Sequence, residues 1–215
     1  PFLALASYMR LALKSSLLAI FFPIFLLNLI SAQDIQTSET QAYTRGLDLY
    51  EQGFFEEAVL QFQAFSENHP AHEMRISSDF YLARALTGAD SSKIESYYKN
   101  FVLKYPGSEF SETLLKDLGH RFTQNEEYEQ AIQYYQQAID SWMPNRTAAE
   151  TKYWISEAAA ENEDYSSARR YFMELANDYP DSEWAPKALY ARGRLYLTQG
   201  HYETASSAFE VLKEL

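Results

Sequence analysis

Apolar residues recur at helical spacing along most of the chain, and prolines interrupt them at regular intervals. Pro70, Pro106, Pro144 and Pro180 lie 36, 38 and 36 residues apart. Each proline follows one apolar-periodic segment and precedes another, where it cannot continue the preceding helix but can open the next. A period of this length predicts an array of helical hairpins. The expected helices span residues 41–52, 55–68, 74–87, 91–104, 109–124, 127–141, 147–162, 165–178, 184–199 and 202–215.

Small and large residues alternate at fixed offsets within each period. The first helix carries a small residue, the second helix carries an alanine twelve residues later, and an aromatic ring follows after four more. A small residue lets two helices approach to about 8 Å, and the ring covers the space beside their crossing. The three positions are Gly46, Leu82, Gly119, Ser156 and Gly193; Ala58, Ile94, Ala131, Ala168 and Ala205; and Phe62, Tyr98, Tyr135, Phe172 and Phe209. Leu82 and Ile94 are too large, so we expect a splayed or shifted second hairpin.

Helix-start signals agree with this division. Ser108 and Ser182 follow proline turns at positions where a side-chain cap is needed, and Ser92 and Thr147 each precede a glutamate at capping-box spacing. We therefore expect all four hydroxyls to cap helices.

This pattern resembles the tetratricopeptide repeat over residues 41–215. The segments FFEEA, EYEQA and HYETA, which end at Ala58, Ala131 and Ala205, are similar to the family's turn into its second helix. The linkers YPGS and YPDS resemble those of exported bacterial members of the outer-membrane assembly and Tol-Pal-associated type. The resemblance implies an all-α fold, a right-handed α-solenoid of about five hairpins. Its units would be about 41–70, 71–106, 107–144, 145–180 and 181–215.

The resemblance also implies a concave groove lined by the first helices. By the family's geometry, the residues three before and one after each small position point into this groove. Residues one helical turn further along the first helix extend the same surface. The implied partner-binding residues are Tyr43, Leu47, Tyr50, Lys116, His120, Tyr153, Glu157, Tyr190 and Arg194, with Asp79, Ala83 and Leu197 in equivalent places. They describe a tyrosine ridge with a basic spot at Lys116 and His120 and another at Arg194. No asparagine occupies a groove position, so the carboxylate clamp of the chaperone-binding relatives is absent and a C-terminal chaperone peptide is not the expected ligand.

The first residues have the features of a secretory signal. Arg10 and Lys14 precede an apolar run from Leu17 to Ile30, and a small-residue cleavage site ends at Ala32. The run of 14 residues is shorter than the roughly 20 needed to span a bilayer. We therefore assign residues 1–8 to an upstream or fragment edge, 9–32 to a signal peptide and 33–40 to a flexible leader. The expected product is exported, periplasmic or in the cell envelope, with no stable membrane insertion after cleavage; an uncleaved anchor is the alternative.

The charge balance limits the classes of partner. The chain has 18 basic and 30 acidic residues, and removal of residues 1–32 leaves a net charge of −14. Nucleic acid and anionic lipid both require a positive surface, so neither is an expected partner. There is no cysteine, which excludes disulfides and thiolate sites.

No residues indicate catalysis, a cofactor or a metal. His69 and His72 lie three apart without a third ligand or an HExxH motif, which favours exposed linker residues. Glu157 and Glu161 have the spacing of a glycosidase pair, but on a helix surface they indicate a solvated or peptide-facing acidic patch. GxSxG, P-loop and GxGxxG motifs are missing. Most of the 17 tyrosines and 14 phenylalanines are needed as packing rings, which leaves few for a carbohydrate platform.

The sequence thus predicts a non-enzymatic exported scaffold or adaptor that binds a protein or peptide segment in its concave groove. An alternative is the recruiting region of a larger envelope enzyme or sensor whose active domain lies downstream. Because the sequence stops inside the second helix of a unit, we expect the repeat to continue beyond residue 215 or its uncapped end to self-associate.

Overall fold

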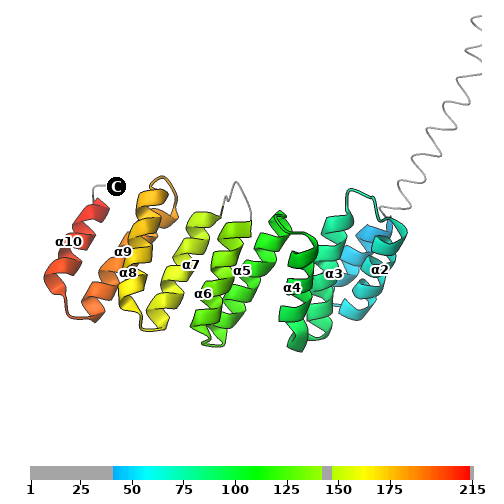
Figure 1. The fold of residues 1–215 in the computed structure, drawn as a ribbon, viewed down its shortest axis with the longest axis horizontal. Coiled ribbons are helices and arrows are strands. Elements are labelled where there is room, and N and C mark those ends of the chain that lie inside the picture. The colour runs from blue at the N-terminus through cyan, green and yellow to red at the C-terminus, as the bar shows by residue number, and fades with distance from the viewer. Residues whose placement is uncertain (1–40, 142–146, 214–215) are drawn as a thin grey trace, which may run out of the picture. The chain divides into compact units, whose positions relative to one another are not determined.

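A computed structural model of the chain describes residues 41–141 and 147–213, and these residues form helices joined by short turns with no β-strand among them (Figure 1). The predicted signal peptide and leader, as well as Pro144, lie outside the described residues. The chain divides into two compact units, Pro1–Ala85 and Leu86–Leu215, with the boundary inside one helix.

The helices follow the predicted order and bounds. A helix covers residues 41–51, and it is followed by α2 (Phe55–Asn68), α3 (Arg75–Ala89), the short 3₁₀ helix η1 (Ser91–Lys93), α4 (Ile94–Lys104), α5 (Glu109–Gln124), α6 (Tyr128–Ser141), α7 (Ala148–Glu161), α8 (Tyr165–Asp178), α9 (Trp184–Thr198) and α10 (Tyr202–Lys213). The observed bounds of α2, α5 and α8 coincide with the predicted ones. None of the described helices has the length and apolar character needed to cross a bilayer.

In the second unit, the helices stack in chain order. From α5 to α10 each helix packs on the next one, and α7 also contacts α9, so these two first helices of successive hairpins lie against each other (Figure 1). This is the packing of an α-solenoid, in which a hairpin contacts only its neighbours. The all-α repeat fold expected from the sequence is confirmed.

Each glycine at a predicted small position lies directly under an aromatic ring of its partner helix. A Cβ atom added to Gly119 would stand 2.4 Å from Cε1 of Tyr135, and one added to Gly193 would stand 2.4 Å from Cε1 of Phe209. Real Cβ atoms essentially never approach heavy atoms to within 3.0 Å. The ring therefore occupies the space of the missing side chain, rather than covering a hole beside the crossing. Gly46 meets Phe62 in the same way in the first unit.

The alanines of the second helices are core residues, as predicted. Ala58, Ala131, Ala168 and Ala205 each have 0 % of their surface exposed. The two departures from the pattern behave differently, since Leu82 and Ile94 are only partly buried. Leu82 packs against the Ala58 and Phe62 cluster of the first unit. The hairpin of α3 and α4, for which the sequence predicts a splay, contains the boundary between the two units. The splay therefore stays a prediction.

Residues with positive φ end the first helix of four hairpins. They are Gly53 (81°), Glu126 (65°), Glu163 (60°) and Gly200 (76°), each seven residues after a small position. Left-handed backbone closes a helix by turning its last carbonyl groups towards new donors. Glycine adopts it without strain, whereas glutamate does so at a cost.

Only one of the four predicted hydroxyl caps is confirmed. The Ser108 side chain accepts a hydrogen bond from the Ser111 N–H at 3.1 Å. Ser92 is not a cap; its own N–H donates to Asp90, which starts η1. Thr147 precedes α7, but its hydroxyl donates to Glu112 of α5. Ser182 donates to the Tyr179 carbonyl instead of accepting from the helix. In these three places tertiary or turn contacts replace the local cap.

Candidate functional site

A pocket of about 300 Å³ opens among α7, α8 and α9 of the second unit. Its walls combine acidic, apolar and aromatic side chains. Helix α7 contributes Glu157, Ala160 and Glu161, the following turn contributes Glu163, α8 contributes Tyr165 and Phe172, and α9 contributes Ala191, Arg194, Leu195 and Thr198. Two predicted groove residues, Glu157 and Arg194, therefore face the same cavity from neighbouring hairpins.

The charged groups of the pocket are not neutralised by one another. Within the described residues, no ion pair within 4 Å joins Arg194 to Glu157, Glu161 or Glu163, and Glu161 and Glu163 pair with no other cation. The lining thus carries three carboxylates and one guanidinium, and its balance is negative. These charges remain available to a bound group.

Tyr153 is not part of the pocket lining, but it contacts the lining residue Phe172 and is held by aromatic neighbours. Its ring centroid lies 5.5 Å from Trp154, 5.6 Å from Phe172 and 5.2 Å from Trp184. Burial, followed by the charge of Glu157 and a hydrogen bond to it, raises the pKa of Tyr153 to about 12, and Arg194 partly offsets this.

Tyr190 lies on the surface of α9, outside the pocket lining. Its side chain is 54 % exposed, and its ring lies 5.7 Å from Phe209. Since Tyr190 and Arg194 are four residues apart, they lie one turn from each other on the same face of the helix. Leu197 is also exposed on α9. Tyr190 is the most accessible of the predicted tyrosines in this unit, whereas Tyr153 is half-buried.

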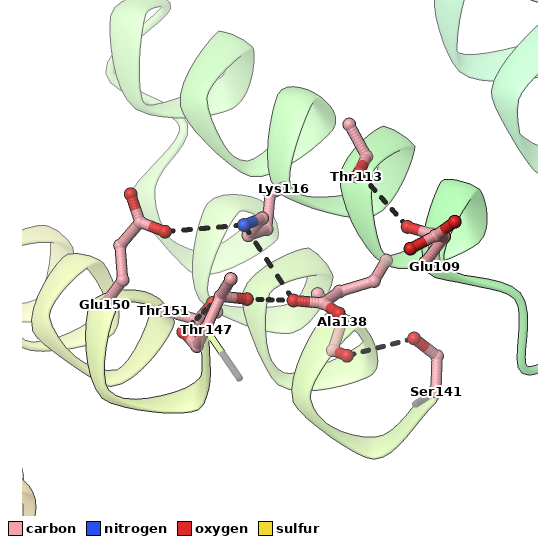
Figure 2. A network of polar contacts seen from close by, with 9 residues as sticks. Glu109, Thr113, Lys116, Ala138, Ser141, Thr147, Glu150 and Thr151 are labelled. Carbon is pink, nitrogen blue, oxygen red and sulfur yellow. Dashed lines mark hydrogen bonds and ion pairs between the residues drawn. The ribbon is translucent and has the colours of Figure 1, made fainter. Parts of the chain in front are cut away.

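Lys116 and His120 do not form the expected basic spot. The Lys116 ammonium lies 3.4 Å from Glu150 and 3.8 Å from Glu112, and its side chain is only 17 % exposed. Figure 2 shows Lys116 of α5 reaching Glu150 of α7, next to Thr147. Two carboxylates thus match its charge, and the network ties one hairpin to the next.

His120 is held towards its neutral form. Its Nδ1 lies 2.8 Å from the Tyr135 hydroxyl in a hydrogen bond, and its ring packs 5.1 Å from that of Trp154. Burial lowers the pKa of His120, against the opposing charges of Asp117 and Glu150. The side chain supports the packing of α5 on α6 and α7, and its predicted role in binding a partner stays a prediction.

The predicted groove residues of the first unit are packing residues. The Tyr43 hydroxyl lies 2.6 Å from Ser77 Oγ, and its ring contacts Phe62, while Leu47 and Tyr50 pack on the same cluster. Asp79 and Ala83 were also expected in the groove, but both are buried. Asp79 pairs with Arg75 at 3.2 Å and accepts a hydrogen bond from Ser66 at 2.6 Å. For Asp79 and Ala83 the expectation is wrong, because both side chains are buried, and Asp79 binds Ser66 of α2.

His69 and His72 are not exposed linker residues. Both are half-buried, and their rings lie 5.1 and 5.3 Å from that of Phe65. His72 Nδ1 also accepts a hydrogen bond from the Met74 N–H at 3.0 Å. Across residues 41–141 and 147–213, no group of three or more histidine, aspartate or glutamate residues is arranged to hold a metal ion.

Several pocket residues were missed by the sequence reasoning. Glu163 lies in the turn, and Tyr165 and Thr198 lie outside the offsets used to select groove positions. Alignment of the four turns would have found Glu163, since it occupies the place of Gly53 and Gly200. Tyr165 begins a second helix, which the groove prediction did not consider.

Comparison with known proteins agrees with this geometry. Family models of the tetratricopeptide repeat match residues 116–183 and 186–214. A crystal structure of MamA protein has a TM-score of 0.59 at 17 % identity and covers 83 % of this chain and 92 % of that one. A tetratricopeptide repeat protein from Parabacteroides merdae ATCC 43184 has a TM-score of 0.59 at 16 % identity, and the match covers 82 % of this chain and 66 % of that one. A double mutant titled MamA RS-1 ArsTM has a TM-score of 0.57 at 12 % identity, and the match covers 82 % of this chain and 93 % of that one. Identities this low establish the fold alone. No curated protein sequence matches.

Proposed function

We propose, from the premise that residues 116–183 and 186–214 are tetratricopeptide repeats, that this chain is a protein-interaction scaffold. Such repeats mediate contacts between proteins. The observation that supports a binding role here is the pocket among α7, α8 and α9, where Glu157 and Arg194 of two hairpins face one cavity. The proposal gives the chain no catalytic step.

The size of the pocket favours part of a peptide over a large cofactor. Ligand pockets enclose about 300–1,000 Å³, and this one is at the lower end. One or two side chains of an extended segment fill such a volume. Tyr190, exposed one turn before Arg194, offers a ring to the next residues of that segment. Aromatic side chains of this kind often dominate the energy of an interface.

A peptide array tests the binding role. The probes are acetylated and amidated twelve-residue peptides of varied sequence, and the full chain is applied to them. Tyr190→Ala should lower the affinity for the retained peptides by about tenfold or more, as truncation of an interface tyrosine does. Tyr202→Ala is the control, because that tyrosine is 71 % exposed on α10 and outside the pocket. Binding of no peptide, or an equal loss in both variants, would refute the proposal.

We further propose that the scaffold acts outside the cytoplasm, in the cell envelope. The support is the signal-like sequence of residues 9–32 and the likeness of the YPGS and YPDS linkers to those of exported bacterial repeats. Mass spectrometry of the product from a bacterial host should give a mature N-terminus at about residue 33. An uncleaved product recovered only from the cytoplasm would contradict the location without touching the binding role.

A further inference from the structure

The pocket among α7, α8 and α9 joins an acidic lining to apolar walls, and this combination selects its occupant. We infer that it holds a lysine or arginine side chain of the bound segment. The inference rests on the proposed function and specifies the chemistry of its ligand.

The charge of the pocket lining favours a basic occupant. Three of the ten lining residues are glutamates, one is an arginine, and none of the four is ion-paired within the described chain. An ammonium or guanidinium entering the cavity would gain charge-assisted hydrogen bonds that the folded protein leaves unmade. An acidic side chain would meet net repulsion, with Arg194 as its single attractive partner.

The backbone that carries two of the glutamates is held by contacts within the fold. Glu157 follows Tyr153 by one turn on α7, and the Tyr153 ring is packed among Trp154, Phe172 and Trp184. Glu163 lies in a turn closed by its own N–H, which donates to the Ala160 carbonyl at 3.0 Å. Glu157 and Glu163 therefore project from helix and turn backbone that is already ordered in the folded chain. Preorganised partners reduce the entropy lost on binding.

Apolar side chains share the pocket lining with these charges. Ala160, Ala191, Leu195 and Phe172 line the cavity beside the glutamates. The two alanines leave space that larger residues would fill. A lysine or arginine has an aliphatic stem that packs on apolar surface while its charged end reaches polar groups. Both parts of such a side chain thus find a matching wall, which a small inorganic cation would not use.

The test uses the same peptide array, and reads which residue is preferred at each position. The native chain should retain peptides with lysine or arginine at one position. Glu161→Lys should lower the affinity for these peptides by about tenfold, because it replaces an attractive charge by a repulsive one. Arg194→Met should raise the affinity for these peptides by up to about fivefold, because it removes a positive charge that repels the basic side chain. A structural defect would lower the affinity in both variants, so a loss with Glu161→Lys and a gain with Arg194→Met would not be explained by it.

Glu129→Lys is the matched control, since it makes the same change of charge on an exposed part of α6 away from the pocket. It should leave the preference intact, and circular dichroism should show that all variants keep their helix content. Retained peptides without any preference for basic residues would overturn the inference but leave the binding role standing. A preference for aspartate or glutamate that disappears in Arg194→Met would also overturn it. If no peptide is retained, both the inference and the proposed function fail.

Discussion

The fit between Gly119 and Tyr135 provides the sharpest test of how this repeat is built. In open space, Gly119→Ala would stabilise α5 by about 1 kcal/mol, because glycine is a poor helix former. Here the added Cβ would stand 2.4, 2.5 and 2.8 Å from three atoms of the Tyr135 ring. Overpacking of a core costs about 1–3 kcal/mol. All three contacts are far inside van der Waals distance, so the cost should lie near the top of this range.

The ring cannot easily move away. Tyr135 is 1 % exposed, and its hydroxyl bonds to His120 and contacts Thr123. The expected net result is a loss of about 2 kcal/mol in the free energy of unfolding. Gly193→Ala should cost less, because its partner Phe209 is only half-buried on α10 and has more freedom to shift.

Urea unfolding followed by tryptophan fluorescence measures this, since Trp154 and Trp184 lie in the same unit. In a double-mutant cycle, Gly119→Ala should be much less harmful when Tyr135→Leu is already present. If Gly119→Ala alone left the chain as stable as before, or more stable, the ring would not depend on the glycine, and the packing argument would be wrong.

Three further changes test other parts of the structure by the same unfolding assay. Glu126→Gly should stabilise the second unit by about 1 kcal/mol by relieving left-handed strain; a loss of stability would show that the turn needs the glutamate. Lys116→Met should cost about 1–3 kcal/mol by leaving the buried Glu112 without its cation, while Lys93→Met, on an exposed pair, should change little. Because the pKa of His120 is lowered in the folded state, stability should fall as pH drops below 6.5. His120→Gln should remove part of that fall, and an unchanged pH profile would contradict the assignment.

The fold was predictable because its determinants are local. Helix bounds follow from apolar periodicity and turn residues, and the hairpin follows from a small residue and a ring at a constant offset. Gly119 and Tyr135 show this offset directly in the sequence. Leu82 and Ile94 were correctly recognised as departures because they do not fit it.

The candidate site was only partly predictable because it depends on contacts between hairpins. Lys116 reads as a free positive charge in the sequence, but its partner Glu150 comes from the next hairpin, 34 residues away. Asp79 reads as a groove residue, but Arg75 and Ser66 bind it inside the first unit. Glu163 and Arg194 share a cavity only because α7 and α9 lie side by side. Of these pairings, only Arg75 with Asp79 lies within one repeat, four residues apart on α3.

The glycine and its ring are sixteen residues apart in the three hairpins that have glycine at the small position, from Gly46 to Phe62, Gly119 to Tyr135 and Gly193 to Phe209. One residue inserted into either helix between them would rotate the ring away from its glycine by about 100°, given 3.6 residues per turn. Insertions and deletions should therefore survive only in the linkers that follow each hairpin. A gene for such a chain can grow or shrink by whole hairpins, each carrying its own matched pair.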